Sequence, residues 1–375
     1  MLAFISSSIE QINCLTIKKF KMGSVWIYLF LMAVLIASFV GGDKIHALGI
    51  FKGWFLFPVI FYVLLINNFN RKNVSRIFYI LYASLITVSF WAILQQTGII
   101  GQLFYQAGDI SFNQYLSEGR AFGPFESPNY LAMYLVPMFF LSLPVLEIVR
   151  AKGAKLILVI SFVFPLLALV LSQSRAGMIT FVLSALIYFN YRFINSQKAS
   201  NRKPFFSWLF VAFLAAVNAG YIYGATVLFK ATTGGDQLRV EIYQRSLLLL
   251  KDNYFFGIGL GNFQTKIADV VFKGMTLDPN AMTYALHPHN LFFAIWLNLG
   301  LVGLVLFITL IVIFFKNVFS SDSILRATLI ASMMAILIHG LFDTTYFKND
   351  LSAIFWLIFA ISLLIKEGAG KSEEN

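Results

Sequence analysis

The chain is a succession of long apolar blocks separated by short polar segments. A helix needs about 20 predominantly apolar residues to cross a bilayer, whereas a β-barrel strand alternates apolar and polar positions over about ten. Residues 27–40 contain barely a polar side chain, so helices are expected. The pattern predicts an all-α polytopic membrane protein that forms a single integral membrane domain over residues 1–375. We expect about ten spans, near residues 24–42, 46–66, 76–98, 128–148, 154–173, 176–193, 205–229, 300–317, 324–342 and 347–365.

The composition excludes a water-soluble globular protein. Hydrophobic residues make up 59% of the chain and charged residues 12%, and the mean hydropathy is +0.79. Soluble domains carry roughly 25% charged residues. Cys14 is the one cysteine among the 375 residues, so neither an intrachain disulfide nor a cysteine-based metal cluster can form.

The distribution of charge predicts the orientation in the membrane. An even number of spans places both termini on one side. The segments on that side carry 17 basic and six acidic residues and hence the whole net charge of +11. Positive charge collects in cytoplasmic loops. We therefore expect both termini in the cytoplasm, and the basic pI requires no nucleic-acid partner.

Two segments on the opposite, extracytoplasmic side are too long to be simple turns, residues 99–127 and residues 230–299. Long loops with apolar stripes are often functional. Residues 237–251 fit a helix suited to the membrane surface, with Leu238, Ile242 and Leu249 on one face, and residues 289–299 fit a second, short helix. The glycine-rich stretch 257–262 follows no strand and lies in no βαβ unit, so it predicts a tight turn rather than a dinucleotide-binding loop.

The four histidines fall on or near this extracytoplasmic side, at His46, His287, His289 and His339. The stretch 287–290, with sequence HPHN, directly precedes the short apolar helix. A helix N-terminus disfavours an imidazolium, which leaves a neutral ring able to accept a proton, and Asn290 can cap the helix. Two histidines at i and i+2 with no third ligand nearby make a poor metal site. A general base is therefore favoured over the two alternatives, which are a metal-binding pair and an interfacial cap without a chemical role.

Arginines on the same side form a second group of candidates, Arg120, Arg175 and Arg239. Arg175 stands in a very short connection between two spans, where positive charge is normally avoided. Arginine binds planar anions such as phosphate through two parallel hydrogen bonds. For Arg120 and Arg239, snorkelling or a surface ion pair with Glu126 or Glu241 is an equally good interpretation. Lys52 and Asp343 are accessory polar candidates, for which structural pairing is the ordinary interpretation.

The order of several short motifs resembles the O-antigen ligase and polymerase superfamily. The similarity spans about residues 119–315 and resides in the ordered set rather than in one motif. Its members are GRAFG (119–123), SPNYLA (127–132), SRAG (174–177), Arg239, NYFFGIG (253–259), HPHN (287–290) and GLVG (300–303).

The resemblance implies a multi-pass glycosyltransferase of the bacterial inner membrane. Such enzymes pass a glycan from undecaprenyl diphosphate to an acceptor hydroxyl on the periplasmic face, with inversion and without a metal, nucleotide or other cofactor. The acceptor is a glycan, a lipid A core or a protein. A flippase or other transporter is the alternative, but it should place charged groups at the membrane midplane, in two repeated halves.

The resemblance also implies residue roles. His289 matches the general base, and Arg175 and Arg239 match the arginines that bind the diphosphate. Arg120 and Asn129 match a recurrent motif that we place in substrate binding. His287 is assigned a supporting role because Pro288 can tilt it away, and Asn290 completes the predicted substrate-binding set.

Overall fold

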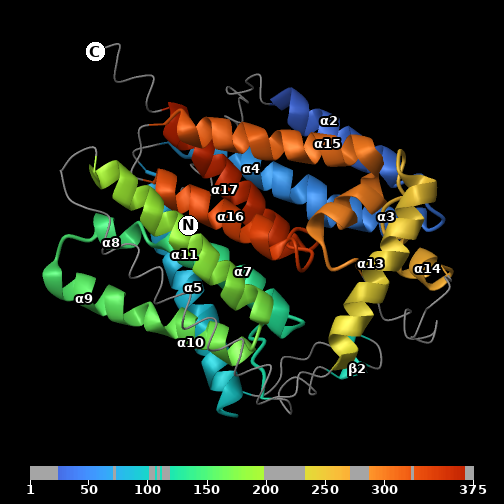
Figure 1. Cartoon of the computed structure of the whole chain (residues 1–375). Coiled ribbons are helices and arrows are strands. Elements are labelled where there is room, and N and C mark those ends of the chain that lie inside the picture. Colours follow the sequence, from blue (N-terminus) through green and yellow to red (C-terminus); the bar gives the residue numbers. More distant parts are fainter. Residues whose placement is uncertain are drawn as a thin grey trace, which may run out of the picture.

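The apolar blocks fold into helices packed side by side, as the sequence predicts (Figure 1). The computed structural model describes residues 24–70, 73–100, 106–107, 110–111, 119–197, 233–270, 287–321 and 325–367. Strands β1 and β2, two residues each, pair antiparallel beside the helices. The elements are α2 Ser24–Ala37, α3 Lys44–Ile50, η1 Phe51–Leu56, α4 Phe57–Asn68, α5 Ser75–Gln96, β1 Gln106–Ala107, β2 Ile110–Ser111, α7 Pro128–Ser142, α8 Val145–Ile148, α9 Lys152–Ser161, α10 Val163–Ser172, α11 Arg175–Gln197, α13 Thr233–Asn253, α14 Phe263–Ala268, α15 Leu291–Phe319, α16 Arg326–His339 and α17 Asn349–Glu367.

Seven helical stretches in the described residues are long and apolar enough to cross a membrane. Two other predicted spans correspond to α2 and α16, which have 14 residues each and are shorter than the usual crossing length. The predicted span at 205–229 lies outside the described residues. The helical class is therefore confirmed, and the number of ten spans stays a prediction. The seven stretches are Lys44–Asn68, Ser75–Gln96, Pro128–Ile148, Lys152–Ser172, Arg175–Phe193, Leu291–Phe319 and Asn349–Lys366.

Helices α7 and α17 form the centre of the bundle, and α9 and α10 lie at its edge. Within an 18-residue apolar window, 72% of the residues are buried in α7–α8 and in α17, against 22% in α9–α10. Helix α7 packs against α5, α10, α11, α16 and α17. The edge exposes large apolar side chains such as Leu156 and Ile157. An apolar exterior of this kind suits contact with lipid rather than with water.

Helix α15 is broken at Gly300, where φ is 70° and ψ is −176°. The predicted short helix 289–299 and the predicted span 300–317 are its two halves. The predicted short helix is thus confirmed as the part of α15 before the break, and the break at Gly300 separates it from the longer part that follows. Gly300 permits the break, since a side chain there would meet the carbonyl of Phe255.

The glycine turn, residues 257–262, packs into this break and confirms the predicted turn. Three of its glycines have φ values of 71°, 84° and 78°. The backbone N–H of Ile258 donates to the carbonyl of Leu297 at 2.7 Å, and the N–H of Leu301 donates to the carbonyl of Phe255 at 3.0 Å. These bonds satisfy backbone groups that the broken helix leaves without partners.

Helix α13 lies across one end of the bundle, on the right in Figure 1. The predicted helix at 237–251 is thus confirmed. The side chains of Ile242 and Leu249 are buried, in a cluster that includes Phe263 and Leu297. The expected apolar face therefore packs against α14 and α15, while the side chain of Leu238 lies outside the described set. Whether α13 lies on a membrane surface stays a prediction.

Candidate active site

Four segments far apart in the sequence meet at one end of the bundle. They are the residues before α15, the residues after α16, the first turn of α7 and the connection between α10 and α11. The N–H of Leu291 donates to the carbonyl of Gly340 at 2.7 Å, which joins the first two segments. The Asn290 side chain caps α15, as predicted, by accepting from the N–H groups of Phe292 and Phe293, and its amide donates to the carbonyl of Leu341.

Asp343 is the residue around which this end is organised. Its side chain is 4% exposed, and its Oδ1 lies 3.3 Å from Nδ1 of His289 and 3.7 Å from Nδ1 of His287. The amide of Asn129 donates to Oδ2 at 3.3 Å, and the N–H of Thr344 donates to Oδ1 at 2.9 Å. We call His287, His289 and Asp343 the histidine–aspartate cluster. A buried carboxylate with several donors is well satisfied as an anion.

The backbone holds His289 in an uncommon conformation. Its φ is 47°, in the left-handed region, and the hydroxyl of Tyr243 donates to its carbonyl at 2.9 Å. Non-glycine residues in this region often occur at functional sites. The side chain stays 24% exposed, so a small group can reach the ring. With Nδ1 directed to Asp343, Nε2 is the ring atom left to accept a proton.

Burial lowers the pKa of His287 to about 4, although the charge of Asp343 acts in the opposite direction. Burial alone would raise the pKa of the Asp343 carboxyl, but the hydrogen bond from His289 and the charge that the imidazoles can carry lower it below its usual value. The cluster therefore contains an anionic carboxylate and a neutral His287 at neutral pH. Burial is the largest cause of the lowered pKa of His287, and a neutral ring at the proposed base His289 stays a prediction.

The sequence argument against a metal rested on the lack of a third ligand, and that premise is wrong. Asp343 supplies the third group, because the chain after α16 folds back onto the residues before α15. One ligand atom from each member of the cluster lies within 4.8 Å of the others. Two imidazoles and a carboxylate are donors that zinc and similar ions accept. Asp343 was singled out only as an accessory residue with structural pairing. Its place at the outer end of a predicted span, four residues after His339, was the available signal.

Arg120 and Arg175 come together at the connection between α10 and α11. Nε of Arg120 donates to the carbonyl of Ser172 at 3.3 Å. Arg175 is the first residue of α11, and the hydroxyl of the preceding Ser174 donates to Oδ1 of Asn129 at 2.9 Å. Because Asn129 also bonds Asp343, this connection is linked to the cluster. Of the predicted acidic partners, Glu126 pairs with Lys348 and Glu241 pairs with Arg245.

Arg239 lies on α13 rather than at the connection between α10 and α11. It lies one helical turn before Tyr243, whose hydroxyl contacts the backbone of His289. Its charge contributes to lowering the pKa of His287, so it is within electrostatic range of the cluster. The structure thus brings all seven predicted site residues to the same end of the bundle. Their roles with substrate stay predictions.

Sequence reasoning did not single out Tyr130, although it lies in the SPNYLA motif. Its hydroxyl is 3.3 Å from Nε2 of His287, and Nζ of Lys348 lies 5.1 Å from the centre of its ring. Tyr243 was likewise missed, because its role is to hold a backbone carbonyl. Both contacts join residues that are far apart in the sequence, so no sequence motif predicts them.

The fold and this site define a helical membrane protein with two imidazoles, a buried carboxylate and several arginines gathered at one end of its bundle. A family model described as O-antigen ligase matches residues 160–308. This match confirms the resemblance to the O-antigen ligase and polymerase superfamily and supports a bacterial membrane enzyme of the glycosyltransferase type. The matched segment includes Arg175, Arg239, His287 and His289, whereas Arg120, Asn129 and Asp343 lie outside it. A search of the curated proteins finds no match.

Proposed function

We propose that the protein transfers a glycan from undecaprenyl diphosphate to an acceptor hydroxyl, with inversion at the anomeric carbon and without a metal. The acceptor is a glycan, a lipid A core or a protein. The observation that carries this proposal is the position of His289, which touches a buried carboxylate and remains open to a substrate beside a group of arginines. The proposal places the site at the extracytoplasmic face of the inner membrane and both termini in the cytoplasm.

In the proposed reaction, Nε2 of His289 takes the proton of the acceptor hydroxyl as its oxygen attacks the anomeric carbon. The new glycosidic bond forms on the face opposite the diphosphate. The bond between the anomeric carbon and the diphosphate oxygen breaks, and its electron pair stays with the diphosphate. Asp343 stabilises the imidazolium that forms, and water later removes the proton. General-base catalysis of this kind typically contributes about 10²- to 10⁴-fold in rate.

Arg175 and Arg239 stabilise the negative charge that grows on the departing diphosphate. Arginine suits this task because its planar fork makes paired hydrogen bonds to phosphate oxygens. Asn129 acts indirectly, by holding Asp343 and Ser174 in place. Arg120 and Asn290 belong to the proposed substrate-binding set, and His287 remains a neutral supporting group.

The substitution His289→Ala tests the proposal in purified protein supplied with undecaprenyl-linked donor. The variant should fold and bind donor about as well as wild type, because the arginines are intact, yet transfer should fall by about 10²- to 10⁴-fold. His287→Ala, the matched control, should be milder.

Treatment with EDTA separates the proposed base from a metal bound by the cluster. Under the proposal, activity survives chelation. A metal site predicts that both histidine variants are equally inactive and that activity lost to EDTA returns with a divalent ion. If the His289→Ala variant transfers glycan at close to the wild-type rate, the assignment of His289 as general base is refuted.

A further inference from the structure

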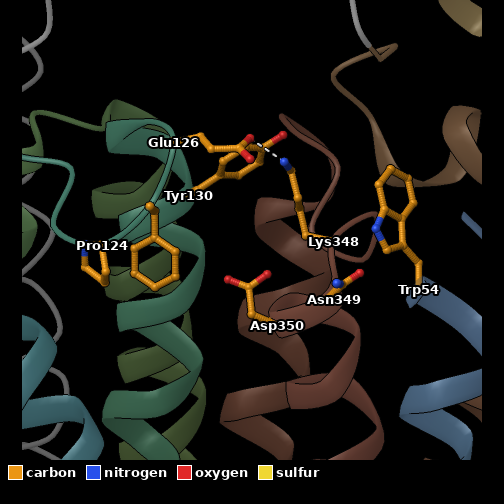
Figure 2. Close-up of a pocket in the computed structure, with 8 residues that line it drawn as sticks. Trp54, Pro124, Glu126, Tyr130, Lys348, Asn349 and Asp350 are labelled. Atoms are coloured by element: carbon orange, nitrogen blue, oxygen red, sulfur yellow. Dashed lines mark hydrogen bonds and ion pairs between the residues drawn. The ribbon is translucent and has the colours of Figure 1, made fainter. Parts of the chain in front are cut away.

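A pocket opens beside the histidine–aspartate cluster, between η1, the start of α7 and the start of α17 (Figure 2). Its volume is about 310 Å³, comparable to the low end of small-molecule sites. Its lining includes the side chains of Trp54, Glu126, Tyr130, Lys348, Asn349 and Asp350.

Tyr130 connects the pocket to the cluster. Its ring forms part of the pocket wall, while its hydroxyl lies 3.3 Å from Nε2 of His287. The rings of His287 and His289 are in turn 4.4 Å apart, centre to centre. A molecule held in the pocket is therefore two side chains away from the proposed base.

The pocket combines flat aromatic faces with hydrogen-bonding groups. Figure 2 shows the rings of Trp54 and Tyr130 flanking Lys348, whose ammonium pairs with Glu126, while Asn349 and Asp350 lie below. Sugars present the same two features, an apolar face of C–H groups and a rim of hydroxyls. Aromatic rings bind the first, and carboxylate, amide and ammonium groups bind the second.

The charge of the pocket separates it from the arginine region. Glu126 and Asp350 supply two carboxylates against the single ammonium of Lys348, so the lining is net negative. An anion such as a diphosphate or a uronic acid is disfavoured there, since the desolvated like charges repel. An uncharged sugar or an amino sugar fits.

We propose that this pocket binds an uncharged or amino-bearing pyranose of the acceptor glycan and so anchors the glycan beside the histidine–aspartate cluster, where a hydroxyl on another sugar of the same glycan meets His289. The assignment to the acceptor, rather than to the donor glycan, rests on the proposed function. It follows from the distribution of charge, because the donor sugar next to the diphosphate belongs beside the arginines.

A binding experiment tests the sugar site without any catalysis. Protein in lipid nanodiscs, free of sugar-based detergent, is titrated with methyl glycosides of glucose, galactose, mannose, N-acetylglucosamine and glucosamine, and with methyl glucuronide. At least one neutral or amino glycoside should change the tryptophan fluorescence saturably, and the glucuronide should not. The signal should disappear in Trp54→Phe and persist in Trp26→Phe, which alters an exposed tryptophan of α2 outside the pocket. No saturable signal, or equal binding of the glucuronide, overturns the proposal.

Steady-state transfer then identifies the source of the sugar. Trp54→Phe and Asp350→Asn should each raise the acceptor KM by about tenfold and leave the donor KM unchanged, with Trp26→Phe as the control. A rise in the donor KM instead would assign the pocket to the donor glycan and overturn the acceptor assignment. If kcat falls with both KM values unchanged, the pocket binds no substrate. Sugar binding that persists while His289→Ala stays active would refute the proposed base and leave the sugar site standing.

Discussion

The histidine–aspartate cluster and the glycine turn both lie next to α15, but they hold neighbouring segments together through different kinds of contact. The cluster joins distant segments through side chains, with the buried Asp343 as the common partner. The glycine turn joins α2, α13 and α15 through the backbone. It requires the absence of side chains, because a Cβ at Gly259 would lie 2.7 Å from the backbone nitrogen of Gly41.

This difference predicts separate consequences of mutation. A conservative change in the cluster removes a charge or a donor and leaves the packing nearly intact, so the fold should survive while the chemistry fails. A small change in the glycine turn adds atoms where none fit, so stability should fall first.

Asp343→Asn should reduce transfer by roughly 10²-fold with little effect on folding, because the amide keeps the shape but loses the charge that orients and stabilises the imidazole. The measurement is kcat in purified protein, together with thermal unfolding. Asp252→Asn, at an exposed position on α13, is the control and should behave as wild type. Unchanged turnover in Asp343→Asn would show that Asp343 only ties α16 to α7.

Arg175→Lys should lower kcat/KM by about 10- to 100-fold, since lysine keeps the charge but not the paired hydrogen bonds. Donor binding and turnover are both measured. The control is Arg192→Lys on the same helix, where the ion pair with Glu147 at 2.8 Å lies far along α11 from the site. If Arg175→Lys shows normal turnover and normal donor affinity, Arg175 is only a topological or ion-pair residue.

Gly259→Ala should lower the free energy of unfolding by about 1–3 kcal/mol, because alanine must adopt a φ near +84° and crowd the backbone of Gly41, just after α2. Activity per folded molecule should change little. Gly42→Ala is the matched control, since a Cβ there meets no atom within 4 Å. A Gly259 variant of wild-type stability but impaired turnover would place the glycine turn in the chemistry and break the comparison.

Much of the fold was predictable because it depends on local pattern. The span expected at 76–98 is helix α5, Ser75–Gln96, and the expected helix at 237–251 lies within α13. The Asn290 cap and the glycine turn were also predicted correctly, because capping and positive φ are properties of neighbouring residues. The lengths of α2 and α16 were overestimated, because apolar composition continues past the last hydrogen-bonded turn.

The candidate site was predicted only in part. His289, Arg175, Arg239 and Asn129 stood out through residue type and motif order. Asp343 was named only as an accessory residue, and because it was not placed beside the histidines, the premise about a third metal ligand was wrong. The importance of Asp343 comes from contacts with residues far away in the sequence, which no periodicity records.

The sequence by itself determined that this is a helical membrane protein, which residues could carry charge or protons, and where its backbone must turn. Those properties follow from hydrophobic length and local backbone preference, which act between near neighbours. Only the tertiary structure decided that the residues after α16 return to the start of α15. That return places the carboxylate of Asp343 against two imidazoles and leaves His287 partly buried, while His289 has a left-handed conformation. Burial and pairing between distant groups depend on how the helices pack, and packing is a property of the whole bundle.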